Sequence, residues 1–519
     1  MFVRLLAFLL LLGLAAAGLA QTPSRGGVAV IVVQADPGHL NPAISTGSHV
    51  HAVADSMYNA LIEFDRDLKP QPDLALRWTV SEGGTLYTFK LAPNVKWHDG
   101  TPFTSADVKF TFDEVLLKHH ARTKAGIGAV LAAIETPAPD TVVFKLRKPY
   151  GALLQLLNVT EAPILPKHLY QGSDPLTHLL NLKPVGTGPF KFESYRTDQQ
   201  VVMVRNPDYF KAGLPYLDRL VFRVVPDSNA QTLALLAGEA DYLGLVNAGD
   251  VERLAARSDL ALAQTAFGTG GGNCITTLSF NLERKPLSEL RVRQAIAHAI
   301  DRQQILRDVQ FGIGKVASAP ISSGLSWAHA AGTLARYTPS AQRATELLDA
   351  AGLAPGADGV RMSLELLHFP TFNRVGEVIR QNLAKVGIRV VQKPLDRAAF
   401  VEAVFSQRAF DLNIISYCNG ADPDSGVRRM YVSDNIGKVP FSNAAAYRNA
   451  EVDKLFALAA ETDKDDERSR HYGEIQKIVA ADLPYWWLVE TVVTTAWRSR
   501  FQGWQPWSGQ VAERAWVRP

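Results

Sequence analysis

The alternation of short apolar runs with segments of helical length constrains the fold of this chain more than any other feature of its sequence. Residues 28–33 (VAVIVV) form a continuous apolar run, which is typical of a strand buried on both faces, and we expect a second buried strand at 220–225. Residues 87–91 and 142–146 alternate between apolar and polar side chains, which predicts half-exposed strands. Strands interleaved with helices predict lobes of the α/β class.

Capping residues and glycines mark where the helices should begin and end. Asp227 is placed to cap a helix that runs to about Ala237, where Gly238 ends it. Thr338 is placed to cap a further helix, and Pro339 follows it at the first helical position. We expect further elements in the second half of the chain: helices at 290–308, 339–352, 374–386, 451–461 and 466–481, and a strand at 388–391.

The N-terminus predicts the compartment. Arg4 precedes an uncharged run over residues 5–20, which is shorter than the roughly 20 residues that span a bilayer. The end of this run, Gly18-Leu19-Ala20, fits a small-x-small cleavage site. We therefore predict a signal peptide over 1–20, cleaved after Ala20, with an uncleaved membrane anchor as the alternative. Because no cysteine stands near that site, lipid attachment is excluded and a periplasmic protein is expected.

Composition and motifs exclude several classes of function. The chain has 519 residues, 47% hydrophobic and 20% charged, which excludes a disordered or fibrous protein. A net charge of +3 gives no support for nucleic-acid binding. Only two cysteines are present, too few for a zinc cluster or a disulfide scaffold. The sequence holds no H-E-x-x-H, G-x-S-x-G, C-x-x-C or P-loop motif, so we expect neither an enzyme nor a bound cofactor.

Two weaker patterns have simple structural explanations. The glycine-rich run at 268–272 is followed by a strand-like segment rather than a helix, so we interpret it as a crossover and not as a phosphate cradle. The histidine pairs His49/His51 and His119/His120 are not accompanied by cysteine or carboxylate residues in a metal-ligand pattern. We therefore interpret them as loop or surface residues rather than metal ligands. An exported α/β chain of this kind is typical of a solute receptor, whose ligand lies between lobes.

Three long stretches carry a resemblance to a known family. The first, over 74–113, reads LALRWTVSEGGTLYTFKLAPNVKWHDGTPFTSADVKFTFD. The second, over 185–244, includes VGTGPFKFESY, VRNPDYF and FRVVPDSNAQTLALLAGEADYLG, and the third, over 279–302, reads SFNLERKPLSELRVRQAIAHAIDR. Together they closely resemble extracellular solute-binding protein family 5, the dipeptide, oligopeptide and nickel receptors of ABC importers.

The resemblance implies a fold like that of type II periplasmic binding proteins, with two hinged α/β lobes and an inserted third lobe. Lobe I is expected to be discontinuous, at 27–66, 187–272 and 491–519. Lobe II, at 67–186, is the insertion, and lobe III covers 273–490. Lobes I and III are expected to close on the ligand like a hinged clam.

The family pattern also implies where the ligand lies. The contacts carried over are the early loop at Gly47, Ser48 and His49, the segment that includes Ser279 and Phe280, and the loop at 416–423. From that last loop the predicted ligand residues are Tyr417, Cys418, Asn419 and Asp422. For Tyr417, stacking on a ligand and simple packing are equal alternatives.

One position departs from the peptide-binding pattern. Peptide-gripping members have an Asp four residues before Pro423 that pairs with the peptide α-ammonium, whereas this chain has Asn419 there. A neutral amide cannot compensate a buried ammonium as a carboxylate does, so the departure weakens the interpretation as an ordinary peptide receptor. Asp422 could substitute, although capping the next segment is the favoured role.

Three arginines and the two cysteines complete the candidates. Arg374, Arg428 and Arg429 could bind a ligand carboxylate, because a guanidinium fits it bidentately. Cys274 and Cys418 fall near the expected site in an oxidising compartment, and the sequence leaves their pairing open.

The leading hypothesis is a monomeric periplasmic receptor that delivers a peptide-like or other small organic solute to the membrane permease subunits of an ABC importer. A nickel or metallophore receptor of the same fold, using His49, His51 or His329, is the alternative. An exported hydrolase or chaperone is a third hypothesis, which no motif supports.

Overall fold

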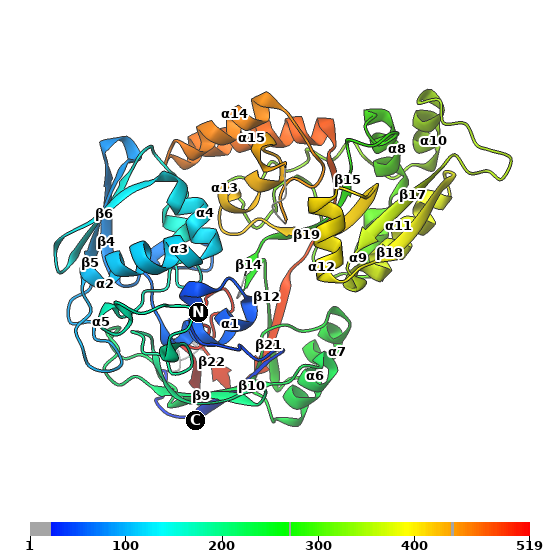
Figure 1. Ribbon diagram of the computed structural model, residues 1–519. Coiled ribbons are helices and arrows are strands. Elements are labelled where there is room, and N and C mark those ends of the chain that lie inside the picture. The colour runs from blue at the N-terminus through cyan, green and yellow to red at the C-terminus, as the bar shows by residue number, and fades with distance from the viewer. Residues whose placement is uncertain (1–21, 269–270, 437–440, 519) are drawn as a thin grey trace, which may run out of the picture.

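A computed structural model describes residues 22–268, 271–436 and 441–518 of the chain. The predicted signal peptide and residues 269–270 of the glycine-rich run lie outside these ranges. The protein is built on three main β-sheets with helices around them (Figure 1). Across the described residues, each helix is too short or too polar to serve as a bilayer span.

The first sheet has seven strands in the order β12-β21-β11-β1-β10-β9-β8, so it joins segments from both ends of the chain. Strand β1 lies inside the sheet and pairs in parallel with both β10 and β11. This position explains its continuous apolar sequence. The strands are β1 (Val28–Val33), β8 (Phe190–Arg196), β9 (Gln200–Arg205), β10 (Arg219–Val224), β11 (Tyr242–Leu243), β12 (Leu260–Thr265) and β21 (Val493–Arg498). Helices α1 (Ser48–Ala54), α6 (Ser228–Ala237) and α7 (Val251–Ala255) belong to the same segments.

The second sheet is antiparallel and has four strands in the order β4-β5-β7-β6. Its strands are β4 (Ala75–Ser81), β5 (Leu86–Leu91), β6 (Leu131–Ala138) and β7 (Thr141–Leu146). Between β5 and β6 the chain forms α2 (Ser105–Phe110), the π-helical turn η4 (Thr111–Leu116), α3 (Leu117–His119) and α4 (Ala121–Val130), and α5 (Lys167–Tyr170) follows later. A capping box of Thr104 and Asp107 starts α2.

The third sheet has six strands in the order β16-β20-β15-β19-β17-β18. Its strands are β15 (Cys274–Phe280), β16 (Lys315–Val316), β17 (Met362–His368), β18 (Ile388–Pro394), β19 (Leu412–Cys418) and β20 (Tyr485–Glu490). Its helices are α8 (Leu290–Ala299), α9 (Arg302–Asp308), α10 (Ala341–Ala350), α11 (Asn373–Ala384), α12 (Arg397–Val401), α13 (Pro423–Gly426), α14 (Ala450–Ala460) and α15 (Asp465–Asp482). Short two-stranded pairs are β2 (Ile62–Phe64) with β3 (Pro70–Pro72), β13 (Phe267–Gly268) with β14 (Gly271–Gly272), and β22 (Phe501–Gln502) with β23 (Trp516–Val517).

Most expected elements are confirmed, and two details are wrong. The single helix expected at 290–308 is two helices, because Ile300 is extended and the Asp301 side chain caps α9. Helix α10 begins at Ala341 with Ser340 as its cap, two residues later than the cap expected at Thr338. The glycine ends are confirmed: Gly238 adopts a left-handed conformation with φ of 80° after α6.

The hydrophobic core is divided unevenly among the sheets. Leu278, Ile414 and Trp486 represent a core that belongs to the six-stranded sheet. A second core is shared, because Phe222 of the seven-stranded sheet and Phe89 of the four-stranded sheet belong to one continuous cluster. The first two sheets are therefore packed together as one hydrophobic unit.

A buried group of charges joins three distant segments next to this shared core. The Lys211 ammonium contacts the carboxylates of Glu63 (2.7 Å), Asp73 (3.0 Å) and Glu513 (2.9 Å). Tyr209 donates a hydrogen bond to Glu513 at 2.6 Å. We call Lys211 and its three carboxylates the Lys211 cluster.

The four-stranded sheet also touches the six-stranded unit. The Gly151 backbone N–H donates to the carbonyl of Ala460, at the end of α14, at 3.1 Å. A side chain at Gly151 would meet the Thr462 carbonyl oxygen at 2.2 Å, so only glycine fits this approach. Lys148 and Glu461 add an ion pair of 3.7 Å at the rim.

Candidate ligand-binding site

Two short connections join the seven-stranded and six-stranded sheets. Residues 266–273 connect β12 to β15, and residues 491–492 connect β20 to β21. Figure 1 shows β12 and β21, paired at one edge of the seven-stranded sheet, side by side in the middle of the molecule. The Thr491 N–H donates to the carbonyl of Cys274 at 2.9 Å, which ties the two connections together. Ligand sites form preferentially at such junctions between lobes.

Cys274 and Cys418 form a disulfide at this junction. They are directly opposite one another in the antiparallel pair of β15 and β19, with 3.7 Å between their Cα atoms. The structure thus answers the question that the sequence left open. The disulfide fixes the start of the loop that carries Asn419.

Asn419 is buried and held by both neighbouring loops. Its N–H donates to the carbonyl of Asn273 at 3.1 Å, and its side-chain oxygen accepts from the Ser322 N–H at 2.8 Å. A side chain on Gly426 would collide with the Asn419 backbone, so α13 packs closely on this loop. Asn419 therefore lies at the junction, but its side-chain oxygen is already used within the fold, and its contact with a ligand stays a prediction.

Asp422 caps α13, which confirms the favoured interpretation of this residue. Its side chain accepts from the Asp424 N–H at 2.9 Å. The same carboxylate forms a bidentate, fully buried pair with Arg468, at 2.8 and 2.7 Å. Both oxygens are occupied, so Asp422 has no free oxygen with which to replace the missing carboxylate at position 419.

Arg429 is a partly buried cation at the junction. Its Nε donates to the carbonyl of Gly426 at 3.1 Å and Nη2 to that of Cys418 at 3.3 Å, while the guanidinium lies 5.8 Å from the centre of the Tyr417 ring. None of the ion pairs within the described ranges includes Arg429. Burial lowers the pKa of Arg429, Tyr417 raises it, and the positive charge of Arg122 lowers it further.

The other two predicted arginines are placed differently. Arg428 has a counter-ion, since its Nη1 lies 3.6 Å from Asp424 Oδ1. Arg374 is exposed at the start of α11, and no contact among the described residues connects it to Arg429. Arg429 is therefore the predicted arginine that best fits an anion site.

Three predicted ligand residues are packed within the six-stranded sheet. Tyr417 is buried, with its hydroxyl donating to the carbonyl of Ser442 at 2.9 Å. Ser279 donates to the Asn413 side chain at 3.1 Å, and Phe280 belongs to the core. Their contact with a ligand stays a prediction, and in this conformation each has a packing role.

The predicted early loop lies at the start of α1. Gly47 precedes the helix, and Ser48 and His49 are exposed in its first turn. The neighbouring Thr46 carbonyl accepts from Arg122 of α4 at 3.3 Å. Arg122 thus contacts this loop and also contributes to lowering the pKa of Arg429.

Histidines give little support to a metal site. Both ring nitrogens of His51 are used, by Asp55 (2.9 Å) and by the Ser45 carbonyl (2.8 Å). The ring of His329 contacts the Ile321 carbonyl (2.7 Å) and the Ser318 hydroxyl (3.0 Å). In the parts of the chain that the structure describes, no three His, Cys, Asp or Glu side chains are grouped to hold a metal ion.

Sequence reasoning missed two charged residues near the site. Arg122 pairs with Glu161 at 2.7 and 2.8 Å on the side of the early loop. Glu490 ends β20 immediately before the second connection and is buried. As the single charged residue of the strand YWWLVE, Glu490 could have been singled out from the sequence, whereas nothing in the sequence distinguishes Arg122.

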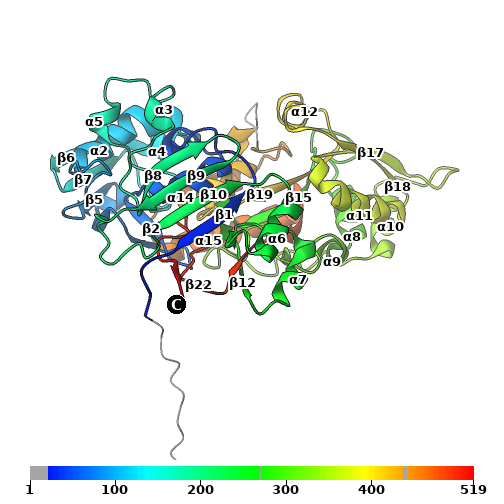
Figure 2. The ribbon, with the colours of Figure 1, turned by 90° about the horizontal axis from the view of Figure 1, so that it is seen from below.

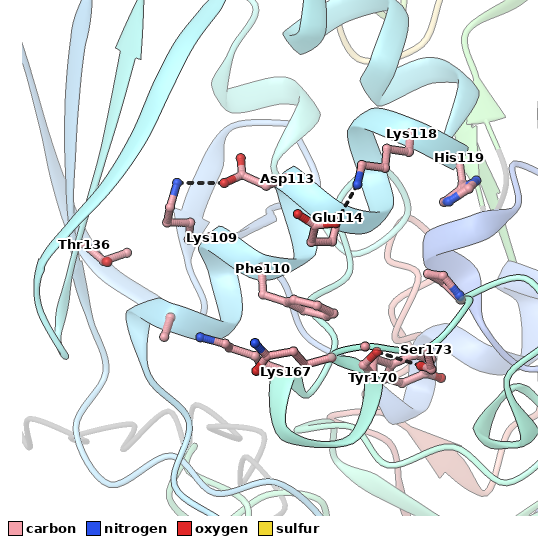
Figure 3. A pocket seen from close by; sticks show the side chains of 14 residues that line it. Lys109, Phe110, Asp113, Glu114, Lys118, His119, Thr136, Lys167, Tyr170 and Ser173 are labelled. Carbon is pink, nitrogen blue, oxygen red and sulfur yellow. Dashed lines mark hydrogen bonds and ion pairs between the residues drawn. The ribbon is translucent and has the colours of Figure 1, made fainter.

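A pocket of about 500 Å³ lies elsewhere, between α2, η4 and α5. Figure 3 shows two of its three lysines pointing at neighbouring carboxylates: Lys109 pairs with Asp113 (2.7 Å) and Lys118 with Glu114 (2.5 Å). It contains none of the predicted ligand residues, so we do not assign the ligand to this pocket.

Comparison with known proteins agrees with the architecture. The oligopeptide-binding protein AppA of Bacillus subtilis is 29% identical over 492 residues, which cover 90% of this chain and 87% of that protein. Its structure in complex with a nonapeptide matches with a TM-score of 0.76 at 26% identity, covering 96% of this chain and 100% of that chain. Di/tripeptide-binding protein 1 of Pseudomonas aeruginosa is 29% identical over 482 residues, 87% of this chain and 86% of that protein.

NikZ from Campylobacter jejuni, solved in complex with Ni(L-His), has the same fold, with a TM-score of 0.75 at 24% identity over 92% of this chain and 95% of that chain. The fold is that of the type II periplasmic binding proteins. The model of the family described as bacterial extracellular solute-binding proteins, family 5, matches residues 69–438. With most of its length covered by that match, this chain belongs to family 5 of the bacterial extracellular solute-binding proteins.

Proposed function

We propose that this protein is a periplasmic receptor that binds a peptide-like or other small organic solute and delivers it to the permease subunits of an ABC importer. Family membership and the peptide-binding relatives support a transport role rather than catalysis. The receptor acts as a monomer, and its signal peptide over 1–20 is removed on export. Sequencing the N-terminus of the exported protein tests this last point, with Gln21 expected as the first residue and a retained Met1 contradicting it.

The three sheets support the proposed division into lobes. Every strand of the seven-stranded sheet falls in lobe I (27–66, 187–272 and 491–519), every strand of the four-stranded sheet in lobe II (67–186), and every strand of the six-stranded sheet in lobe III (273–490). Lobes I and III are joined by only two short connections, which suits closure about a hinge.

The observation that carries the proposal is the guanidinium of Arg429. A partly buried cation without a carboxylate partner is unfavourable unless something else supplies the negative charge. Arg429 lies beside the disulfide and the Asn419 loop, where the two large sheets are connected. The ligand therefore carries a carboxylate, which a guanidinium binds with good geometry.

Native mass spectrometry of protein purified without denaturation tests this function. We expect a co-purifying solute that bears a carboxylate, and an Arg429→Met variant that has lost it. Arg389→Met, which removes an exposed arginine paired with Asp358 on the same sheet, is the matched control and should retain the solute. Co-purification of a metal chelate would favour the nickel alternative, and turnover of peptides by an empty protein would favour a hydrolase.

A further inference from the structure

Glu490 is a buried carboxylate that has no cation as its partner among the described residues. It is 5% exposed, and no ion pair within the described ranges includes it. Its oxygen Oε2 accepts from the Ser323 N–H (2.9 Å), the Ser323 hydroxyl (2.6 Å) and the Ser322 hydroxyl (3.3 Å). No described residue donates to Oε1. Hydroxyl and amide donors solvate a buried carboxylate only in part, so its charge is incompletely compensated.

A single residue, Ser322, bridges Glu490 to Asn419, the position at which the family pattern implies a carboxylate. The Ser322 N–H donates to the Asn419 side chain at 2.8 Å, while the Ser322 hydroxyl donates to Glu490. Ser322 therefore connects the neutral Asn419 with a charged Glu490. The negative charge absent from the loop after β19 is present at the end of β20, which is separated from β19 in the sheet by β15.

Lys315 is opposite Glu490 in the pairing of β16 with β20 and forms no direct ion pair with it. The Lys315 ammonium donates to the Ser323 hydroxyl at 3.4 Å, and that hydroxyl donates to Glu490 at 2.6 Å, so this cation is held apart from the carboxylate and compensates its charge only in part. The other buried carboxylates of the neighbouring loop have cations: Asp422 pairs with Arg468, and Asp424 lies 3.6 Å from Arg428. Glu490 is thus distinguished by charge and not only by burial.

We infer that Glu490 binds the ammonium group of the ligand, in place of the carboxylate that other peptide-binding members carry at the position of Asn419. The inference rests on the proposed function and narrows the class of ligand that the receptor binds. With Arg429 as the site for a carboxylate, the ligand is a zwitterion with a free amine, such as a short peptide. The contact is a charge-assisted hydrogen bond between the ligand ammonium and the Glu490 carboxylate.

Calorimetry with tri-alanine and N-acetyl-tri-alanine tests this assignment. The wild-type protein should bind the free amine at least about tenfold more tightly, as expected for a hydrogen bond between charged groups. Glu490→Gln keeps an oxygen for Ser322 and Ser323 but removes the charge. It should weaken tri-alanine binding by about ten- to hundredfold and abolish the preference for the free amine.

Controls separate this role from a structural one. Glu365→Gln, an exposed carboxylate of β17 in the same sheet, should leave both affinities unchanged. Since Gln removes an uncompensated buried charge, ligand-free Glu490→Gln should melt no lower than the wild type. A variant that melts lower and binds less well, or that keeps the preference for the free amine, would overturn the assignment.

The remaining outcomes distinguish this inference from the proposed function. If Asp424→Asn lost the preference for the free amine while Glu490→Gln kept it, the ligand ammonium would be assigned to Asp424 instead. Equal wild-type binding of both peptides would overturn the role of Glu490 and leave the peptide receptor standing. Binding of neither peptide would overturn the role of Glu490 as the site of a peptide ammonium, and the receptor would then bind a non-peptide solute.

Discussion

At the scale of single residues, the Lys211 cluster is the densest group of paired charges among the described residues. One ammonium is surrounded by Glu63, Asp73 and Glu513, all largely withdrawn from water. Removing one member of a buried ionic group leaves the others uncompensated, which costs far more than breaking a surface pair.

Lys211→Met should therefore lower the free energy of unfolding by about 3–5 kcal/mol. Urea unfolding of the variant and the wild type at neutral pH measures this loss of stability. The control is Lys118→Met, which breaks an exposed pair with Glu114 and should change stability by less than about 1 kcal/mol. Similar values for the two variants would show that the Lys211 cluster contributes no more than a surface pair.

The Lys211 cluster also predicts that the free energy of unfolding depends on pH. Burial raises the pKa of Glu63 to about 7; Lys211 opposes this shift, and Glu513 and Asp73 add to it. The folded state then holds a proton that the unfolded state loses near the ordinary glutamate pKa of 4.5. Stability contributed by Glu63 is therefore complete below pH about 4.5 and is lost as the pH rises towards about 7.

Glu63→Gln should remove this part of the pH dependence, because Gln is neutral at every pH. The difference in unfolding free energy between variant and wild type should grow in favour of the variant from pH about 4.5 to about 7. Urea titrations across this range measure it. A difference that stays constant would mean that Glu63 titrates equally in both states.

At the scale of elements, the disulfide links two strands that lie next to each other in the sheet but far apart in the sequence. Cys274 and Cys418 are 144 positions apart, so the crosslink closes a long loop in the unfolded chain. Such a crosslink restricts the unfolded ensemble more than it strengthens the folded one.

Reduction of the Cys274–Cys418 disulfide should lower the free energy of unfolding by about 2–5 kcal/mol. Urea unfolding with and without reductant measures the effect, and the Cys274→Ser/Cys418→Ser variant should match the reduced protein under both conditions. If the variant matched the oxidised protein instead, the crosslink would be without effect on stability.

Local patterns in the sequence predict elements better than they predict contacts. The apolar run of β1 and the left-handed Gly238 after α6 follow from short-range chemistry, and both are as expected. The helix over 290–308 is interrupted because Asp301 caps α9 and its N–H donates to Asn382, a contact 81 residues away. No local pattern contains that information.

The site shows the same limit. Asp422 as a cap is a local feature and was predictable, whereas its pairing with Arg468 depends on how α15 packs. Arg429 was recognised as an anion candidate, yet only the structure shows that it has no counter-ion among the described residues while Arg428 has one. The prediction for Arg374 was made from residue type alone, and its exposure on α11 gives it no support.

At the scale of the whole molecule, the shared core implies that the proposed lobes I and II move together. Their hydrophobic cluster is continuous, whereas the proposed lobe III has a core of its own. Figure 2 shows β5, β6 and β7 beside β8 and β9 at one end of the molecule, and β17 and β18 at the other. Closure of lobes I and III would thus bring lobe II along, and the contact of Gly151 with the end of α14 would form or break with it.

Gly151→Ala should hinder that contact, because the new methyl group would lie 2.2 Å from the Thr462 carbonyl oxygen. We expect a larger radius of gyration in solution scattering and weaker ligand binding than in the wild type. Gly473→Ala, in α15 with open space around it, is the control and should change neither quantity. An unchanged radius for Gly151→Ala would mean that the contact does not couple to closure.

The seven-stranded sheet draws strands from both ends of the chain, and this has a consequence for the order of synthesis. Strand β1 emerges first from the ribosome, but its partners β10 and β11 follow about 200 residues later, and β21 comes near the end. The four-stranded sheet is contiguous and can close early. Until β10 and β11 are made, β1 is an apolar strand without its partners, and β11 and β12 then wait for β21 until the chain is nearly complete. Such unpaired strands invite aggregation, so the nascent chain is exposed to it during most of its synthesis.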